Sequence, residues 1–347
     1  MPTEMATVLE RASVAPGRSE RVRSVCFVAW GAVAGRSEEI AAAVGGEARC
    51  CFAPGARWRP PVLVRWVVSA VATVAYLLRR RPKVVVVTNP PIFAALVAYG
   101  CARLIGASVI MDSHPGAFGV QGDRVAAKLQ RVHRWMVRRA ALVLCTEETW
   151  CEQVRSWGGT ATVVHEAPSR WDCPDPARHD PLRVLVVGRF SADEPIAEVV
   201  EAARMVPDCQ FSLTGESDRC PPEVRAALPA NAALVGFMAP DAYSQAVAEA
   251  DVILTLTTEP TSVMRAAYEA VYARRPLIVS DWPIDRDLFP QALHAANERA
   301  ALALAVRSMC ARYDAYAASV DHALAVQSAR WADQRRTLIE AIEQLSG

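Results

Sequence analysis

Two polar side chains close the apolar run "ASVIMD" in "MDSHPG", namely Asp112 and His114 beside a Pro-Gly turn. A carboxylate and an imidazole two residues apart can share a proton-transfer task, because either can act as a general base or the aspartate can orient the imidazole. We predict these two residues to be catalytic, and the sequence leaves open which of them is the base. A helix-capping aspartate beside a structural histidine is the alternative interpretation.

A second pair, Gly188 and Arg189, closes the apolar run "LRVLVV". A glycine lets a phosphate approach the backbone, and an arginine offers paired donors to a diphosphate. Thr214 and Gly215 in "LTGES" form a similar turn after the next apolar run. An ordinary strand-end glycine with a surface arginine is the alternative. The sequence lacks G-x-G-x-x-G and P-loop motifs, which argues against a dinucleotide dehydrogenase or a nucleoside triphosphatase.

A third candidate, Glu269, is the lone acid in the apolar helical stretch "RAAYEAVY". We expect this helix to begin just after "DVILTLT", with Thr261 and Ser262 at its phosphate-favouring N-terminus and Glu269 about two turns further on. A buried carboxylate needs partners, and a sugar diol supplies two hydroxyl donors. An ion pair with Arg265, four residues earlier, is the alternative.

Apolar runs alternate with helical segments along both halves of the chain. The runs lack polar alternation, which predicts strands buried on both faces and therefore parallel sheets. The proline-rich segment "SRWDCPDPARHDP" interrupts the alternation, which then restarts. We therefore predict an α/β protein with two Rossmann-like, doubly wound parallel-sheet domains that face a central cleft, where ligands bind at the carboxyl ends of strands.

The predicted domain boundaries follow from where this alternation begins, stops and restarts. Residues 1–22 are expected to be a disordered extension, residues 23–168 the first domain and residues 169–181 the linker. Residues 182–325 are expected to form the second domain. The pattern from 293 to the end is helical, and residues 326–347 are expected to form a terminal helix that packs back on the first domain.

Charge is divided unevenly between the halves. Up to Asp175 there are 22 Lys and Arg against 14 Asp and Glu, a net charge of +8, whereas the remainder has 16 against 23, a net charge of −7. The basic half suits an anionic lipid surface or a phosphorylated substrate, or it helps the two halves dock. No nucleic-acid-binding module is recognisable, so we expect no nucleic-acid partner.

Two helical segments of the basic half are relevant to the question of membrane binding. Residues 61–81 are nearly all apolar but are interrupted by Arg65 and run straight into a strand, which predicts a buried or membrane-touching helix rather than a spanning one. Around "DRVAAKLQRVHRWMVRR", four cations share one face, which suits an anionic membrane surface or a solvated helix. Without C-x-x-C pairs or a visible signal peptide, we expect reduced thiols and a cytoplasmic protein, in peripheral contact with the inner face of the cell membrane.

The order of these motifs resembles the GT-B glycosyltransferases, in particular family 4 and the dolichol-pathway chitobiosyl-lipid β-mannosyltransferase. "VVVVTNPPIFAALVAYGCARLIGASVIMDSHPGAFG" is similar to that mannosyltransferase's stretch of strand, Asn-Pro-Pro, helix, strand and Asp-x-His. "AGRSEEIA" resembles its Gly-Arg-Ser turn, and "VMRAAYEAVYARRPLIVSD" resembles the donor-site helix and strand of both groups. The resemblance covers about Val22 to Pro283.

The resemblance implies a hexosyltransferase that moves a sugar from a GDP- or UDP-sugar to a hydroxyl of a lipid-linked or polysaccharide acceptor. It implies that Glu269 binds the ribose hydroxyls and that Arg189, with Arg265, neutralises the diphosphate. The remaining donor residues would be Gly188, Thr214, Gly215, Thr261 and Ser262. The acceptor side would include Gly35, Arg36, Asn89 and Pro90. The resemblance also implies metal-independent leaving-group chemistry, so we expect neither a metal nor another cofactor.

Two positions depart from the family 4 pattern. Thr261 stands where the earlier of two glutamates is usual, and Glu194 stands where a lysine is usual, although the β-mannosyltransferase also has Asp-Glu there. These departures motivate one alternative, a catalytically lost scaffold that binds a partner. A transferase for a small secondary metabolite and a nucleotide-sugar epimerase are two further alternatives.

Overall fold

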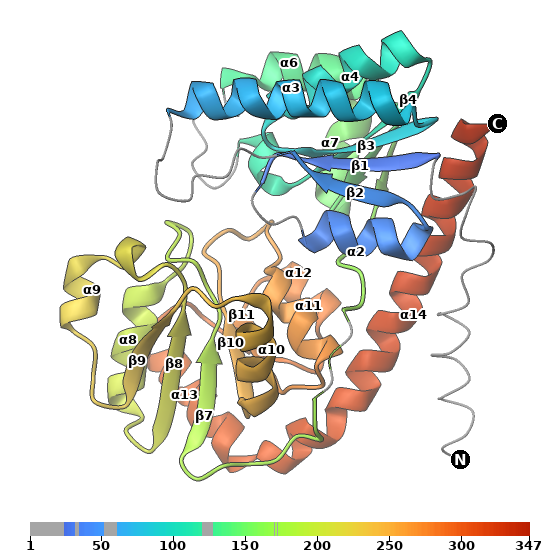
Figure 1. The fold of residues 1–347 in the computed structure, drawn as a ribbon. Coiled ribbons are helices and arrows are strands. Elements are labelled where there is room, and N and C mark those ends of the chain that lie inside the picture. The colour runs from blue at the N-terminus through green and yellow to red at the C-terminus, as the bar shows by residue number, and fades with distance from the viewer. Residues whose placement is uncertain (1–23, 32–34, 52–60, 120–127, 170, 172) are drawn as a thin grey trace. The chain divides into compact units, whose positions relative to one another are not determined.

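The computed structural model describes residues 24–31, 35–51, 61–119, 128–169, 171 and 173–347. The predicted disordered extension, residues 1–22, lies outside the described residues. The chain divides into two compact units (Figure 1). The first unit comprises Met1–Ala167 and Arg330–Gly347, and the second comprises Pro168–Ala329.

The first unit is built on a six-stranded parallel sheet in the order β2-β1-β3-β4-β5-β6. Its strands are β1 (Val25–Ala29), β2 (Glu47–Cys50), β3 (Val84–Asn89), β4 (Ser108–Ser113), β5 (Leu142–Cys145) and β6 (Ala161–Val163). Its helices include α2 (Gly35–Val44), α3 (Val62–Arg80), α4 (Ile92–Ile105), α6 (Gln130–Val137) and α7 (Glu148–Ser156). The sequence did not predict β2, because "EARC" is a short edge strand without an apolar run.

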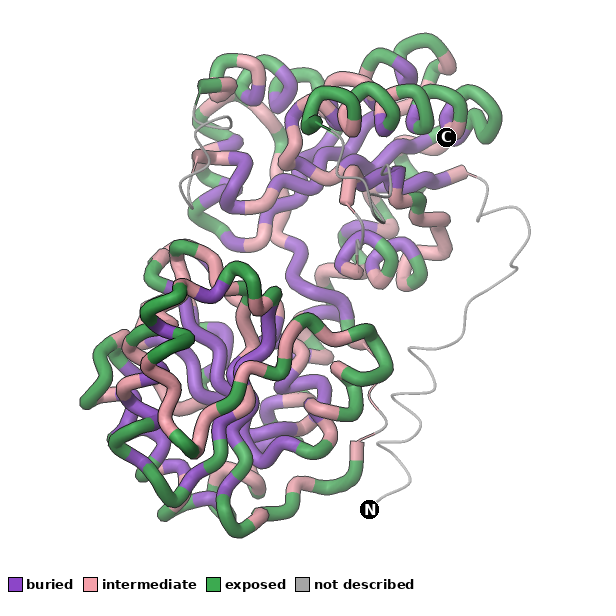
Figure 2. Tube along the Cα trace, turned by 60° about the vertical axis from the view of Figure 1, so that its left-hand side comes forward, coloured by how far each residue is buried: buried purple, intermediate pink, exposed green. Residues whose placement is uncertain are grey.

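Successive residues of the central strands point to opposite faces of this sheet, and each face has its own helices. Val85 and Val87 belong to the core shared with α3, α4, α6 and α7. Val84 and Val86 belong to the other core, together with α2 and three residues of the terminal helix: Trp331, Leu338 and Ile342. Burial on both faces explains the unbroken valine run (Figure 2).

The second unit has its own six-stranded parallel sheet, in the order β12-β11-β10-β7-β8-β9. Its strands are β7 (Leu182–Val186), β8 (Cys209–Thr214), β9 (Ala232–Gly236), β10 (Val252–Thr255), β11 (Leu277–Ser280) and β12 (Leu293–Ala295). Its helices are α8 (Ile196–Met205), α9 (Pro222–Ala226), α10 (Pro240–Glu249), α11 (Arg265–Tyr272), α12 (Pro283–Leu288), α13 (Arg299–Ala311) and the start of α14 (Tyr313–Ser346). The prediction of purely helical structure from residue 293 onward was wrong, because the three residues of β12 extend the sheet edge beside β11.

Helix α14 is continuous from Tyr313 to Ser346, so it begins well before the predicted start at residue 326. Its residues from Arg330 onward belong to the first unit. There Arg335 donates a 2.6 Å hydrogen bond to the carbonyl of Ala43 at the end of α2. The two parallel, helix-flanked sheets confirm the predicted pair of Rossmann-like domains.

Candidate functional site

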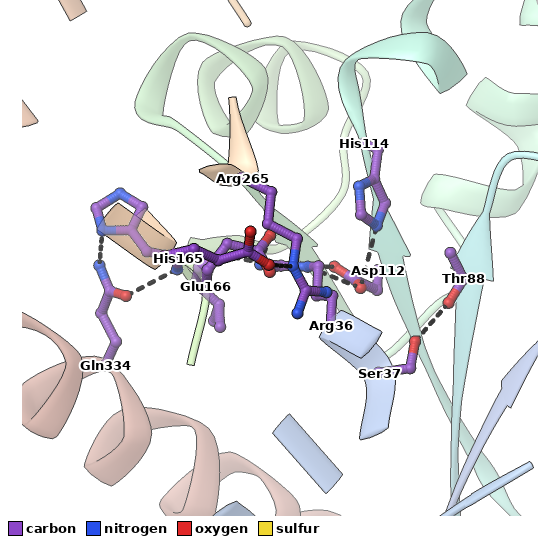
Figure 3. Close-up of polar contacts among 11 residues, drawn as sticks. Arg36, Ser37, Thr88, Asp112, His114, His165, Glu166, Arg265 and Gln334 are labelled. Atoms are coloured by element: carbon purple, nitrogen blue, oxygen red, sulfur yellow. Dashed lines mark hydrogen bonds and ion pairs between the residues drawn. The ribbon is translucent and has the colours of Figure 1, made fainter. Parts of the chain in front are cut away.

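The predicted catalytic aspartate lies at the carboxyl end of β4, where its carboxylate is buried against an arginine (Figure 3). Arg36, from the first turn of α2, donates from Nε to Asp112 Oδ2 at 3.1 Å and from an Nη to Oδ1 at 3.1 Å. The same guanidinium donates to Glu166 Oε1 at 3.0 Å and to the carbonyl of Val164 at 2.7 Å. This paired geometry fixes the carboxylate at the carboxyl-terminal end of the strands.

The charges in this cluster set its protonation. Burial by itself would raise the pKa of Asp112, but the cation of Arg36 and the neighbouring His114 outweigh burial and hold that pKa well below its usual range. Burial would likewise lower the pKa of Arg36, but Asp112 and Glu166 outweigh it and raise that pKa. Asp112 therefore stays ionised, and a carboxylate with such a low pKa is a weak proton acceptor.

His114 is better exposed than the aspartate. Its side chain is 30% exposed, and its Nε2 atom lies 3.3 Å from Asp112 Oδ2. Its backbone N–H donates to the carbonyl of Asn89 at 2.9 Å, which joins the ends of β3 and β4. The structure thus brings together both predicted catalytic residues at the carboxyl end of one sheet.

The predicted acceptor-side residues surround the same strand ends. Gly35 opens α2 directly before Arg36, and the adjacent Ser37 hydroxyl lies 2.9 Å from that of Thr88 in β3. Asn89 is 1% exposed and donates to the Ser113 hydroxyl at 3.4 Å, and Pro90 follows it. Arg36 was predicted to face an acceptor, but its donors are engaged by the buried cluster, so its geometry suits a positioning role.

Three residues of this region were missed by the sequence prediction. Glu166 follows β6 and pairs with Arg36, and a polar "HE" after the last predicted strand was the available signal. Next to it, the His165 ring Nδ1 lies 3.0 Å from Gln334 Nε2, and the His165 backbone N–H donates to Gln334 Oε1 at 2.8 Å. Burial, with the charges of Arg330 and Arg36, lowers the pKa of His165 to about 3, so the ring is neutral.

In the second unit, the turn after β7 is held by a carboxylate from its own chain. Glu194 accepts hydrogen bonds from the backbone N–H groups of Arg189 and Phe190, both at 2.9 Å. A Cβ atom on Gly188 would lie 2.5 Å from Glu194 Oε2. Gly188 is therefore required for the approach of this internal carboxylate, and the exposed Arg189 side chain is the part of the turn that faces solvent.

Thr214 and Gly215, at the end of β8, contact that same turn. The Gly188 N–H donates to Thr214 Oγ1 at 3.1 Å. Gly215 has a φ of +123°, and a Cβ there would lie 2.8 Å from the ring of Phe190. These glycines allow the two strand ends to pack closely, as the sequence interpretation expected of a turn.

Helix α11 begins at Arg265, so the prediction that it starts just after "DVILTLT" was wrong. Thr261 and Ser262 precede the helix in a turn closed by the Ser262 N–H, which donates to the Glu259 carbonyl at 3.2 Å. Pro260 lies within this turn, and its ring cannot contribute an N–H to a helix.

Glu269 has two protein donors. Arg265 Nε donates to its Oε1 at 2.7 Å, and the Tyr243 hydroxyl of α10 donates to its Oε2 at 2.6 Å. The ion pair with Arg265 is the one named as an alternative from the sequence. Burial, followed by the charge of Glu269, raises the pKa of Tyr243, so the hydroxyl remains a donor.

The loop after β10 is anchored at one carbonyl that the sequence prediction did not identify. Ser280 Oγ at 3.0 Å, Trp282 Nε1 at 2.8 Å and Asn297 Nδ2 at 2.8 Å all donate to the carbonyl of Thr257. Asp193, beside Glu194, accepts the Thr258 N–H on its own carbonyl at 2.7 Å. These bonds tie the loops after β7 and β10 to each other and to the end of β11.

No group of three or more His, Cys, Asp or Glu side chains that could hold a metal ion is found in the described part of the chain. The expectation of metal-independent chemistry stays a prediction.

Comparison with known proteins supplies the class. Residues 11–169 match the family model of the glycosyl transferase 4-like domain. No curated protein sequence matches the chain.

Solved structures supply the fold. Sucrose-phosphate synthase from Thermosynechococcus elongatus is 16% identical with a TM-score of 0.68, covering 93% of this chain and 96% of that chain. HepE of Anabaena, in complex with UDP and glucose, is 15% identical with a TM-score of 0.70, covering 92% and 99%. UDP-GlcNAc 2-epimerase from Neisseria meningitidis, bound to UDP-GlcNAc, is 10% identical with a TM-score of 0.56, covering 92% and 100%.

The fold is GT-B. Since epimerases share it, the fold alone does not distinguish transfer from epimerisation. The match of residues 11–169 to the glycosyl transferase 4-like domain supports the predicted enzyme class, a glycosyltransferase.

Proposed function

We propose that the protein transfers a hexose from a nucleotide sugar to a hydroxyl of a lipid-linked or polysaccharide acceptor. The observation that carries this proposal is the partly exposed imidazole of His114 against an ionised Asp112, at the carboxyl ends of β3 and β4 in a glycosyl transferase 4-like domain. This is the position where parallel sheets bind ligands.

We assign His114 as the base and Asp112 as the residue that positions it. In the neutral imidazole one ring nitrogen carries a proton and the other accepts one. We assign the proton to Nε2, which lies 3.3 Å from Asp112 Oδ2, and this leaves Nδ1 as the acceptor. The acceptor hydroxyl oxygen forms a bond to the anomeric carbon, the bond from that carbon to the diphosphate oxygen breaks, and the hydroxyl proton passes to His114.

The donor residues belong to the second unit. Glu269 would accept hydrogen bonds from the ribose hydroxyls, alongside its bonds to Arg265 and Tyr243. The side chain of Arg189 would neutralise the diphosphate as it leaves, with help from Arg265. Because Glu194 occupies the N–H groups of its turn, charge neutralisation there falls on the Arg189 side chain rather than on the backbone.

The identity of the nucleotide has two sources of support that differ. HepE and the epimerase were solved with uridine nucleotides, which favours UDP. The motif resemblance to the β-mannosyltransferase favours GDP. The basic first half supports an acceptor at an anionic membrane surface and hence a place at the inner face of the cell membrane, where the protein would be peripheral.

Calorimetric titration with UDP, GDP and dTDP tests the donor assignment. We expect one nucleotide to bind and Glu269→Ala to weaken that binding at least about tenfold, as expected when a carboxylate loses hydrogen bonds to ligand hydroxyls. His114→Ala is the matched control, because it lies on the acceptor side and should bind the nucleotide normally. Absence of binding for all three nucleotides would contradict the proposal.

An epimerase would need no acceptor. Incubation of the enzyme with the nucleotide sugar that binds, without acceptor, followed by chromatography of the sugar, separates the two activities. A new epimer in that incubation would support the alternative, whereas transfer predicts no sugar product other than slow hydrolysis.

A further inference from the structure

Helix α3 of the first unit buries two hydroxyl side chains and exposes most of its aliphatic ones. Its buried residues are Ser69, Thr73 and Leu77, spaced four apart along one side. Thr73 Oγ1 accepts a 2.9 Å hydrogen bond from the Trp30 indole and donates at 2.8 Å to the Ser69 carbonyl. A helix that met only water would have the opposite arrangement.

The outer side of α3 is aliphatic along five turns. Leu63 is 71% exposed, Val67 63% and Val71 64%. Between residues 62 and 78 every exposed side chain is Val, Leu or Ala: Val62, Leu63, Val64, Val67, Val68, Val71, Ala72, Val74, Ala75 and Leu78. A continuous apolar strip of this size indicates an interaction surface.

Helices α4 and α6 lie on the same face of the sheet as α3 and extend this surface (Figure 1). Leu104 of α4 is 80% exposed, and Trp135 of α6 is 41% exposed, with the guanidinium of Arg139 4.1 Å above its ring. Indole rings with neighbouring cations are typical of the interface between lipid headgroups and acyl chains.

The charged side chains of helices α3, α4 and α6 are all cationic, and one of them, Arg80, is paired with Glu47 of β2. Helices α3, α4 and α6 contain no Asp or Glu and six arginines: Arg65, Arg79, Arg80, Arg103, Arg131 and Arg134. Arg81 follows the end of α3 and is exposed. An aliphatic strip bordered by arginines is complementary to an anionic lipid surface, and it has few hydrogen-bonding groups for a protein partner.

We propose that the outer side of α3, with Leu104 and Trp135, inserts into the surface of an anionic lipid bilayer. The helix is long and apolar enough to cross a membrane. Its inner side, however, is bonded to the sheet: the Tyr76 hydroxyl donates to Cys26 Sγ at 3.3 Å, besides the Trp30 bond to Thr73. It therefore lies along the surface while the domain remains folded.

This surface gives the first domain access to an acceptor whose lipid part stays in the bilayer. That consequence rests on the proposed function, whereas lipid binding itself does not. The two can therefore fail independently.

Co-sedimentation with vesicles tests the surface. We expect the wild-type protein to sediment with vesicles of phosphatidylcholine and phosphatidylglycerol, and less with phosphatidylcholine alone. The double variant Val67→Glu/Val71→Glu should lower the partition coefficient at least about tenfold, because it removes apolar area and places acids against anionic lipid. Both side chains face outward, so the fold should tolerate the changes.

A matched control and a second variant sharpen the test. Leu304→Glu, on α13 of the second unit, alters a side chain that is 63% exposed and should leave vesicle binding unchanged. Arg79→Ala/Arg81→Ala should weaken binding to anionic vesicles about tenfold, and the difference should vanish at high salt. Nucleotide titration of every variant reports whether the second unit and the donor site are intact.

Two outcomes would overturn the proposal. The first is a wild-type protein that does not sediment with either type of vesicle. The second is a wild-type dimer in light scattering that becomes monomeric in the Val67→Glu/Val71→Glu variant without any lipid binding, because the strip would then be an interface between two copies of the chain. A wild-type protein that binds no nucleotide would instead contradict the proposed function. The result of the vesicle experiment would not be affected by that.

Discussion

Each unit places an arginine–glutamate or arginine–aspartate pair near the carboxyl ends of its strands, but the two pairs are built differently. In the first unit both side chains are almost fully buried, since Arg36 is 6% exposed and Asp112 4%. In the second unit Glu269 is 14% exposed and its partner Arg265 35%. The first pair can hardly exchange its partners for a ligand, whereas the second can. The first therefore suits positioning, and the second suits binding.

The largest expected effect comes from breaking the buried pair. Arg36→Ala leaves Asp112 and Glu166 without their cation, so the free energy of unfolding should fall by about 3–5 kcal/mol. Urea unfolding followed by circular dichroism measures it. Arg265→Ala, in the exposed pair, should cost at most about 1 kcal/mol. Equal losses for both variants would remove the distinction between the units.

A double variant separates the loss of the ion pair between Arg36 and Asp112 from the cost of leaving a buried carboxylate unpaired. Arg36→Leu/Asp112→Leu leaves only Glu166 without its cation, so it should destabilise the protein less than Arg36→Ala, which leaves two carboxylates without theirs. If the double variant is instead the less stable one, the arginine stabilises the first unit mainly through packing.

A buried carboxyl without a cation should behave in the opposite way to Asp112. Asp285 in α12 is also 3% exposed, and burial raises its pKa to about 7. The folded protein binds this proton more tightly than the unfolded chain, so the contribution of Asp285 to stability falls as the pH rises from about 4 through about 7. At pH 8, Asp285→Asn should be more stable than the wild type by about 2–4 kcal/mol.

The pH series for Asp285→Asn provides its own control. Below about pH 3 the wild-type carboxyl is protonated in both states, so the variant and the wild type should have the same free energy of unfolding. A difference that does not change with pH would mean that the pKa of Asp285 is the same in the folded and unfolded chains. A variant that becomes less stable than the wild type as the pH rises would mean that a cation governs Asp285 as it does Asp112.

The sequence predicted most of the fold because most strands are unbroken apolar runs. "KVVVVT" and "ASVIMD" are examples in which burial on both faces leaves no other interpretation. The prediction failed at one edge of each sheet, where β2 and β12 are too short to give a pattern. It also failed at the start of α11, because residues 258–264 form a loop that resembles a helix entry.

Part of the site could not be predicted for a different reason. Arg36 and Glu166 are 130 residues apart, and only the folded sheet brings their charges together. Gly188 was correctly placed in a tight turn, but the group that needs its missing side chain in the structure is Glu194 rather than a phosphate. Spacing in the sequence indicates where a close approach occurs, and it does not reveal which group approaches.

The two candidate catalytic residues, His114 and Asp112, should respond differently to substitution. His114→Ala should lower kcat about 10²-fold, because it removes the base, while nucleotide affinity stays unchanged. Asp112→Asn should lower kcat as well, because the imidazole loses its orienting charge, but only Asp112→Asn should also lower the free energy of unfolding. A normal kcat for His114→Ala would leave Asp112 as the base, against its low pKa.

The smallest expected effect concerns the more exposed pair, Arg265 and Glu269 of the second unit. Tyr243→Phe removes the hydroxyl that lies 2.6 Å from Glu269 Oε2 and leaves the bond from Arg265 to Oε1 in place. This bond positions the carboxylate without touching the ligand, so its loss should cost about 1 kcal/mol of binding and lower the affinity for the nucleotide about fivefold, less than for Glu269→Ala. Calorimetric titration measures both variants under the same conditions. If Tyr243→Phe binds the nucleotide more tightly than the wild type, the tyrosine competes with the ribose for Oε2, and the second pair binds its ligand by exchanging partners rather than by adding one.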